Sequence, residues 1–212
     1  MARTVQGKLI DRLFTLYVIH RCRAEHGLNC ISETKMQKIV FYAQKKLIDN
    51  RIKAINYSFV KVRFPTFSHE LRNDLTDLTE QGFLSGGYYK EQEKAEKLLK
   101  DFSEVFGNNP VIKSLIDQEI DTYATMETGE LVAKTQKLLW KGKRIESLTR
   151  GTPLLYPLKP EKVKAELAVS DEILEQLELC LSPVVAEKIG KANEDMLRGR
   201  RLTHAEVFGN LC

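Results

Sequence analysis

Apolar residues recur along most of the chain at spacings of three and four positions, the period of an α-helix with one buried face. The first such stripe predicts a helix from about Val5 to Glu25 that Gly27 ends. A second helix follows, with Ser32 as its N-cap. Its core stripe consists of Met36, Ile39, Val40, Ala43 and Leu47. Its lysines are expected to face solvent: Lys35, Lys38, Lys45 and Lys46.

The period changes to two over residues 58–64, which predicts a half-buried strand that Pro65 ends. Its apolar side alternates with Lys61 and Arg63 and is formed by Val60, Val62 and Phe64. Ser68 is the predicted N-cap of a third helix that ends at Gly82 and turns Leu71, Leu75 and Leu78 to the core. Residues 83–89 indicate a short strand or a turn around Gly86-Gly87.

Helical periodicity then predicts helices over residues 95–106, 112–123 and about 129–141. Residues 143–160 contain three prolines and are interpreted as a linker or surface arm. Further helices are expected to start at Ser170 and Ser182-Pro183, and a last one at Thr203, whose Thr-His-Ala-Glu is a capping box. The prediction is a mainly α fold with a few short strands, divided into a helical core (1–156) and a C-terminal helical appendage (157–212).

The composition favours helices and an intracellular location. With 12 Gly and 6 Pro in 212 residues, the chain lacks the turn residues of an all-β architecture. No apolar segment reaches membrane-spanning length, and the N-terminus has no signal-peptide pattern, so we expect a cytoplasmic protein with no membrane partner. The four cysteines form no CxxC pair and are expected to be reduced thiols.

The sequence offers little catalytic or metal-binding chemistry. Cys22, His26 and Cys30 recur at four-residue intervals and could begin a zinc site, but Gly27 is expected to interrupt the helix between them. No nucleophile elbow or phosphate-binding glycine loop is present, and Gly86-Gly87 is more typical of a turn. We therefore expect no enzyme activity, no catalytic residues, no cofactor and no metal.

Nucleic-acid binding is the alternative that the element order raises. Helix, strand, helix and possible wing between Thr34 and Tyr89 suggest a partly winged-helix-like core, in which the helix over residues 68–81 would enter the major groove of DNA. That helix carries four carboxylates against the single Arg72, and the net charge of the chain is only +4. Because phosphates repel carboxylates, we expect DNA binding to be weak or absent.

The segment Thr34-Lys35-Met36-Gln37-Lys38-Ile39-Val40-Phe41-Tyr42-Ala43-Gln44 resembles the opening signature of the Panacea (SocA-like) antitoxin domain. Residues 64–84 resemble the next block of that family, although Pro65-Thr66 stands where the family usually has Gly-Pro, and residues 143–154 resemble a later block. The resemblance covers about residues 5–156. It implies a protein that neutralises a toxin by direct binding, or that delivers the toxin to a protease as an adaptor; a chaperone is a further possible partner.

The C-terminal part resembles the tails of small type II antitoxins, which wrap around a toxin with apolar and basic contacts. The similarity runs from Ser182 to Val207. An ordinary helix–turn–helix end, with Gly199 as C-cap and Thr203 as the next N-cap, explains the same residues equally well. If the likeness holds, the partner-binding residues would be three apolar anchors and three arginines: Ile189, Met196, Phe208, Arg198, Arg200 and Arg201. A DNA-binding regulator or a scaffold protein of a mobile genetic element remains an alternative.

Overall fold

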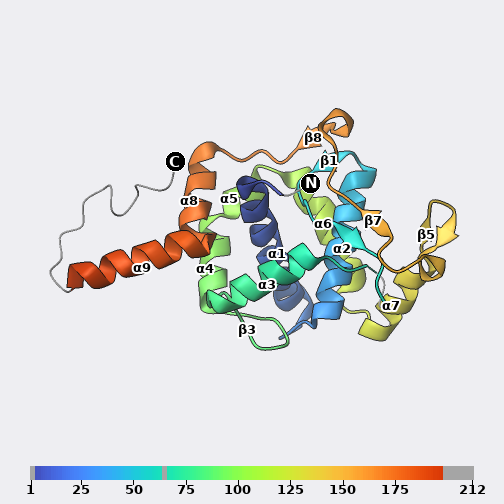
Figure 1. The fold of residues 1–212 in the computed structure, drawn as a ribbon, viewed down its shortest axis with the longest axis horizontal. Helices are drawn as coiled ribbons and strands as arrows, with labels where there is room; N and C mark the ends of the chain where they lie inside the picture. The colour runs from blue at the N-terminus through green and yellow to red at the C-terminus, as the bar shows by residue number, and fades with distance from the viewer. Residues whose placement is uncertain (1–2, 64–65, 198–212) are drawn as a thin grey trace. The chain divides into compact units, whose positions relative to one another are not determined.

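The computed structural model describes residues 3–63 and 66–197, and it is mainly α-helical with a few short strands, as predicted (Figure 1). The described helices are α1 (Val5–His26), α2 (Glu33–Asp49), α3 (His69–Glu80), α4 (Glu93–Asp101), α5 (Ser103–Gly107), α6 (Pro110–Tyr123), α7 (Thr128–Lys137), α8 (Asp171–Leu181) and α9 (Pro183–Leu197). Two short 3-10 helices are η1 (Ile145–Ser147) and η2 (Pro160–Lys162).

The described strands form two-stranded pairs. They are β1 (Ile52–Lys53), β2 (Phe59–Val60), β3 (Leu84–Ser85), β4 (Lys90–Glu91), β5 (Leu139–Trp140), β6 (Lys143–Arg144), β7 (Pro153–Leu155) and β8 (Ala165–Glu166). Strand β8 pairs in parallel with β1, and β7 pairs antiparallel with β2, so distant segments of the chain lie side by side (Figure 1). The pairs β3–β4 and β5–β6 are local antiparallel hairpins.

The serines predicted to start helices and the glycine predicted to end the first helix do so in the structure. Ser32, Ser68 and Ser170 each accept a hydrogen bond from the backbone N–H three residues later, which satisfies a donor left open at the helix start. Gly27 adopts the left-handed conformation (φ 66°) and ends α1, where its N–H binds the carbonyls of the last turn.

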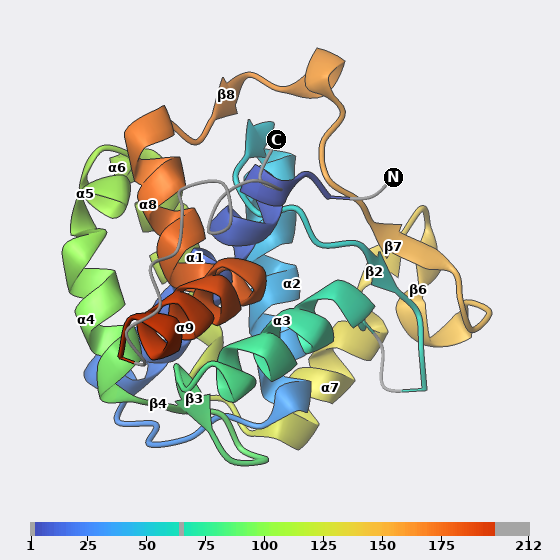
Figure 2. The same cartoon turned by 60° about the vertical axis from the view of Figure 1, so that its left-hand side comes forward.

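Helix α2 is enclosed on all sides over its middle part. All nine residues from Met36 to Gln44 are buried, so this helix has no solvent face over more than two turns. It packs against α1, α6 and α7. Figures 1 and 2 show α1 and α2 between α4 and α5 on one side and α7 on the other.

Two glutamines of α2 bind the backbone of the irregular segment that precedes α3. Gln44 Nε2 donates to the carbonyl of Tyr57 at 2.7 Å, and the N–H of Tyr57 donates to Gln44 Oε1 at 3.1 Å. Gln37 makes the same paired contact with Ser68, at 3.0 and 2.8 Å. Because a buried backbone group without a partner costs about 1–3 kcal/mol, these amides take the place of a neighbouring strand.

The predicted strand over residues 58–64 and the predicted linker over residues 143–160 are both wrong in part. Strand β2 covers only Phe59–Val60, and the buried positions are Phe59 and, just after the strand, Lys61, the opposite phase to the prediction. Leu154 and Leu155 are buried in β7, because β7 pairs with β2 and supplies apolar residues to the core. The predicted helix over residues 129–141 ends at Lys137 and is followed by the hairpin β5–β6.

The chain divides into compact units at Val169/Ser170 rather than after residue 156. The reason is that residues 164–167 hydrogen-bond with Arg51 and Lys53, and Ala168 exchanges hydrogen bonds with Asn109. In the second unit, α8 and α9 pack against each other. No helix within the described ranges combines the length and apolarity that a membrane span requires.

A buried network of charged side chains joins α1 to α3. Arg3 lies 2.6 Å from Asp74 and 2.9 Å from Asp11, and Arg12 binds Asp74 at 3.1 Å. The hydroxyl of Tyr57 also donates to Asp74, at 3.0 Å. Asp74 therefore accepts hydrogen bonds from two arginines and a buried phenol, while Asp11 and Asp77 supply further negative charge.

Replacing Asp74 by Asn is expected to lower the free energy of unfolding by about 3 kcal/mol, because two buried guanidinium groups lose their shared carboxylate. The matched control is Glu80→Gln on the exposed side of the same helix, with an expected change within about 0.5 kcal/mol. Urea unfolding of both variants measures the difference. Equal, small effects for the two would show that the network contributes little to stability.

Candidate functional site: a basic pocket beside helix α2

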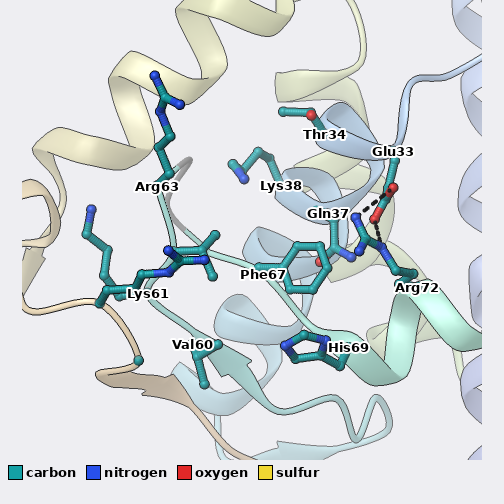
Figure 3. A pocket seen from close by; sticks show the side chains of 13 residues that line it. Glu33, Thr34, Gln37, Lys38, Val60, Lys61, Arg63, Phe67, His69 and Arg72 are labelled. Carbon is teal, nitrogen blue, oxygen red and sulfur yellow. Dashed lines mark hydrogen bonds and ion pairs between the residues drawn. The ribbon is translucent and has the colours of Figure 1, made fainter.

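A pocket of about 450 Å³ opens in the first unit between the start of α2, the end of β2, the start of α3 and the loop that follows η1. Its cationic lining consists of Lys38, Lys61, Arg63, Arg72 and Arg150, and the one carboxylate that lines it is Glu33. Figure 3 shows Lys38 reaching from α2 toward Arg63, above the ring of Phe67. The pocket therefore carries a surplus of positive charge.

Lys38 is a buried cation, contrary to the prediction that it faces solvent. Only 2% of the residue is exposed, because α2 is enclosed on all sides at this point. Its Nζ donates to the carbonyl of Thr66 at 3.0 Å. Burial lowers the pKa of Lys38 to about 7, and the negative charge of Glu33 opposes that shift only in part.

The acceptor of this bond belongs to a residue with an unusual backbone. Thr66 has φ 66°, in the left-handed region that β-branched residues rarely adopt. It is fully buried, and the hydrogen bond from Lys38 stabilises its carbonyl in that position. The contacts of Gln37 with Ser68 fix the chain two residues further on. One helix thus determines the shape of this side of the pocket.

Glu33 does not neutralise Lys38, because it is bound to Arg72. Arg72 Nε lies 2.7 Å from one carboxylate oxygen of Glu33, and Nη2 lies 3.3 Å from the other (Figure 3). This bidentate pair raises the pKa of Arg72 and keeps it charged. Among the described residues no carboxylate lies within ion-pair distance of Lys38 Nζ.

An aromatic surface lies next to the cations. The Arg72 guanidinium carbon is 4.6 Å from the centre of the Phe67 ring, and the ring of His69 meets Phe67 edge to face at 4.8 Å. Phe67 is half-buried and lines the pocket. The pocket can therefore offer a flat apolar surface and positive charge to the same ligand.

The partner-binding residues predicted from the sequence are not located by the structure. Arg198, Arg200, Arg201 and Phe208 lie outside the described residues, as does the helix expected after Thr203. Ile189 and Met196 belong to α9, but their side chains also lie outside what is described. These six residues stay a prediction.

The candidate zinc ligands separate as the interruption at Gly27 predicts. Cys22 is buried in α1, Cys30 is exposed beyond the end of that helix, and neither forms a disulfide. His26 Nε2 instead lies 2.9 Å from Asp121. In the described part of the chain, no three potential ligand side chains gather around one point.

The expectation that α3 presents carboxylates to DNA is wrong, because most of them face the protein. Asp74 is buried, Asp77 binds Arg12, and Glu70 accepts a hydrogen bond from the backbone of Ser58 at 2.7 Å. The exposed positions of α3 are His69, Arg72, Asn73, Thr76 and Glu80. This outward surface is close to neutral.

The sequence does contain a signal for the pocket that its periodicity does not reveal. Gln37 and Lys38 interrupt an otherwise apolar run from Met36 to Ala43, and Gln44 follows it directly. A helix whose apolar residues cover more than one face is buried all round, so polar residues within it need internal partners. The partners come from residues 57–68 and cannot be identified from spacing alone.

The burial of Lys38 predicts how the stability of the protein depends on pH. Unfolded Lys38 titrates near 10.5 and folded Lys38 near 7, so between these values the unfolded chain binds more protons and stability falls as pH is lowered. From pH 9.5 to 7, the free energy of unfolding should fall relative to Lys38→Met by up to about 1.4 kcal/mol per pH unit. Denaturant titrations at several pH values measure this difference, and parallel pH profiles would contradict it.

No protein-family model matches the chain, and no curated protein or solved structure matches it either. Function must therefore be inferred from the geometry of the chain's own residues, together with the resemblance carried by the α2 segment and the C-terminal segment.

Proposed function

We propose that this chain is the antitoxin of a toxin–antitoxin pair and that it neutralises a partner toxin by direct protein–protein binding. The proposal starts from the resemblance of residues 34–44 to the Panacea signature. Delivery of the toxin to a protease would use the same contact and differs only in the fate of the toxin after it is bound.

The observation that supports this proposal most is the internal use of the signature residues. Gln37, Lys38 and Gln44 all hydrogen-bond to backbone groups of residues 57–68, and the Tyr42 hydroxyl lies 3.2 Å from that of Thr135. The polar positions that carry the resemblance are thus the ones that hold the fold together. A shared signature of this kind favours a shared framework, on which the surface that binds a partner can vary.

The antitoxin-like resemblance falls on the unit that begins at Ser170. Its described part, residues 170–197, contains α8 and α9 and is separate from the first unit in its contacts. A paired amphipathic helix can bury apolar anchors in a groove of a toxin, while neighbouring arginines orient the contact. Ile189, Met196 and Phe208 are the proposed anchors, with Arg198, Arg200 and Arg201 beside them.

Replacing Ile189 and Met196 by Ala in the full chain is expected to weaken toxin binding. Truncating a buried anchor costs on the order of 1–4 kcal/mol, or about ten- to several-hundred-fold in affinity. The protein is first tagged in its host so that the copurifying toxin is identified. Calorimetry and rescue of growth on co-expression then compare the variants with wild type.

The matched control is Glu187→Ala with Lys191→Ala, an exposed pair on the same helix. It should leave rescue intact, whereas deletion of residues 170–212 should abolish rescue and preserve the cooperative melt of residues 1–169. Full protection by the deleted chain would place recognition on the first unit. Loss of the melt would show that the two units share one core. Copurification of no toxin-like protein would contradict the proposed function itself.

A DNA-binding regulator is the second candidate, and the outward surface of α3 favours it. Because most carboxylates of this helix are turned inward, the exposed Asn73 could contact base edges and the hairpin β3–β4 could act as a wing. Under this alternative, the chain binds its own promoter with nanomolar affinity. Asn73→Ala would then relax the sequence preference, whereas Asn108→Ala, at the C-terminal cap of α5, would not. Gel-shift titrations at two salt concentrations distinguish this result from non-specific binding.

A further inference from the structure

The basic pocket beside α2 contains an amine, Lys38, that has no carboxylate partner among the described residues. Within the part of the chain that the structure describes, Lys38 Nζ is buried and makes one hydrogen bond, to the carbonyl of Thr66, although an ammonium group has three protons to donate. Glu33, the carboxylate that lines the pocket, is bound to Arg72. A buried charge without a counter-ion is costly, so an anion that enters the pocket would lower that cost.

Other cations lie around Lys38. Lys61 is buried, with 8% of the residue exposed, while Arg63 and Arg150 are exposed at the rim. They come from the end of β2 and from the loop after η1, so three separate segments contribute positive charge. Convergence of this kind concentrates the field on the pocket.

The dimensions and the aromatic lining narrow the class of ligand. A volume of about 450 Å³ lies within the range of small-molecule sites, about 300–1,000 Å³, and exceeds what a single inorganic ion needs. Phe67 offers an apolar ring next to the cations, with the edge of His69 beside it. A flat heterocycle stacks favourably on such a ring.

We propose that this pocket binds a nucleotide-sized organic phosphate, with the phosphate group at Lys38 and Arg150 and the flat ring against Phe67. All residues of this site belong to the first unit, and the proposal does not depend on the identity of any toxin. A bound phosphate would supply the acceptor that the ammonium of Lys38 lacks. Because Lys38 also holds the carbonyl of Thr66, phosphate binding would stabilise the segment between Thr66 and Ser68.

Protonation of Lys38 gives this site a distinctive pH dependence. Groups that face Lys38 are Glu33 on α2, Lys61 and Arg63 after β2, His69 and Arg72 on α3, and Arg150 after η1. Because burial lowers the pKa of Lys38 to about 7, much of the amine in the empty pocket is neutral at pH 8.5. A bound phosphate favours the ammonium form, so affinity should fall as pH rises. A pocket of permanent cations would behave in the opposite way, since a phosphate monoester gains charge as pH rises through about 6.

Isothermal titration calorimetry of the full chain with AMP, adenosine and inorganic phosphate tests the proposal. AMP should bind with a dissociation constant below about 1 mM, and at least tenfold more tightly than either fragment, because only AMP occupies both surfaces. Between pH 7.0 and 8.5 the affinity for AMP should fall by up to about tenfold.

Arg150→Ala should weaken AMP binding roughly three- to tenfold without a change in stability, because Arg150 is exposed and its loss removes only a charged contact at the rim. Lys97→Ala on α4, also exposed and remote from the pocket lining, is the matched control and should bind as wild type does. Lys38→Met should remove the pH dependence of binding. If that variant fails to fold by circular dichroism, Arg150→Ala and the wild-type pH series still decide the question.

Three results would overturn the proposal. The first is no AMP binding to the wild-type chain at 1 mM, a concentration set by the expected affinity of about 1 mM or tighter. The second is inorganic phosphate binding as tightly as AMP, which would exclude a role for the aromatic surface. The third is binding of a duplex DNA, abolished by Arg150→Ala, by a chain that does not bind AMP. This result would assign the pocket to a nucleic-acid backbone.

Discussion

The fold depends on how one enclosed helix satisfies the backbone of a segment that belongs to no extended sheet. Residues 54–58 and 66–68 lie on either side of β2 in the sequence. Strand β2 is only two residues long, so its ladder provides few of the hydrogen bonds that their backbone needs. Gln44 and Gln37 of α2 supply paired donors and acceptors to Tyr57 and Ser68. Their spacing of seven residues, two helical turns, places both amides on the same side of α2. The α3 helix therefore begins at a fixed distance from α2.

The same arrangement produces the basic pocket. Once Ser68 and Tyr57 are held against α2, the carbonyl of Thr66 faces Lys38, and the side chain of Lys38 is enclosed beside it. Arg3 and Arg12 share Asp74, and Arg72 holds Glu33. Lys38, by contrast, has a carbonyl but no carboxylate as a partner among the described residues, which makes the pocket a candidate for binding an anion.

The helices could be predicted from the sequence because their signals are local. Ser32, Ser68 and Ser170 cap the helices that they were expected to cap, and Gly27 ends α1. The burial of Lys38 and of Lys61 could not be predicted, because it depends on segments that are distant in the sequence. Lys38 is enclosed where α2 packs against α1, α6 and α7, and Lys61 follows β2, which pairs with β7 more than 90 residues away. For the same reason, the segment around Leu154 is typical of a linker in the sequence although it is part of the core. The inward direction of Asp74 likewise depends on residues that are distant in the sequence, because its partners Arg3 and Arg12 lie more than 60 positions earlier in the chain.

Native-state hydrogen exchange at the amides of Tyr57 and Ser68 tests the central role of α2 most directly. Neither amide belongs to a helix or to a strand ladder, so a loop would exchange both quickly. If Gln44 and Gln37 hold this segment, both amides will exchange as slowly as the buried amides of α2 itself. Exchange of either amide as fast as that of the exposed turn at Gly86-Gly87 would contradict the account, since the pocket and the start of α3 would then lack the support assigned to them.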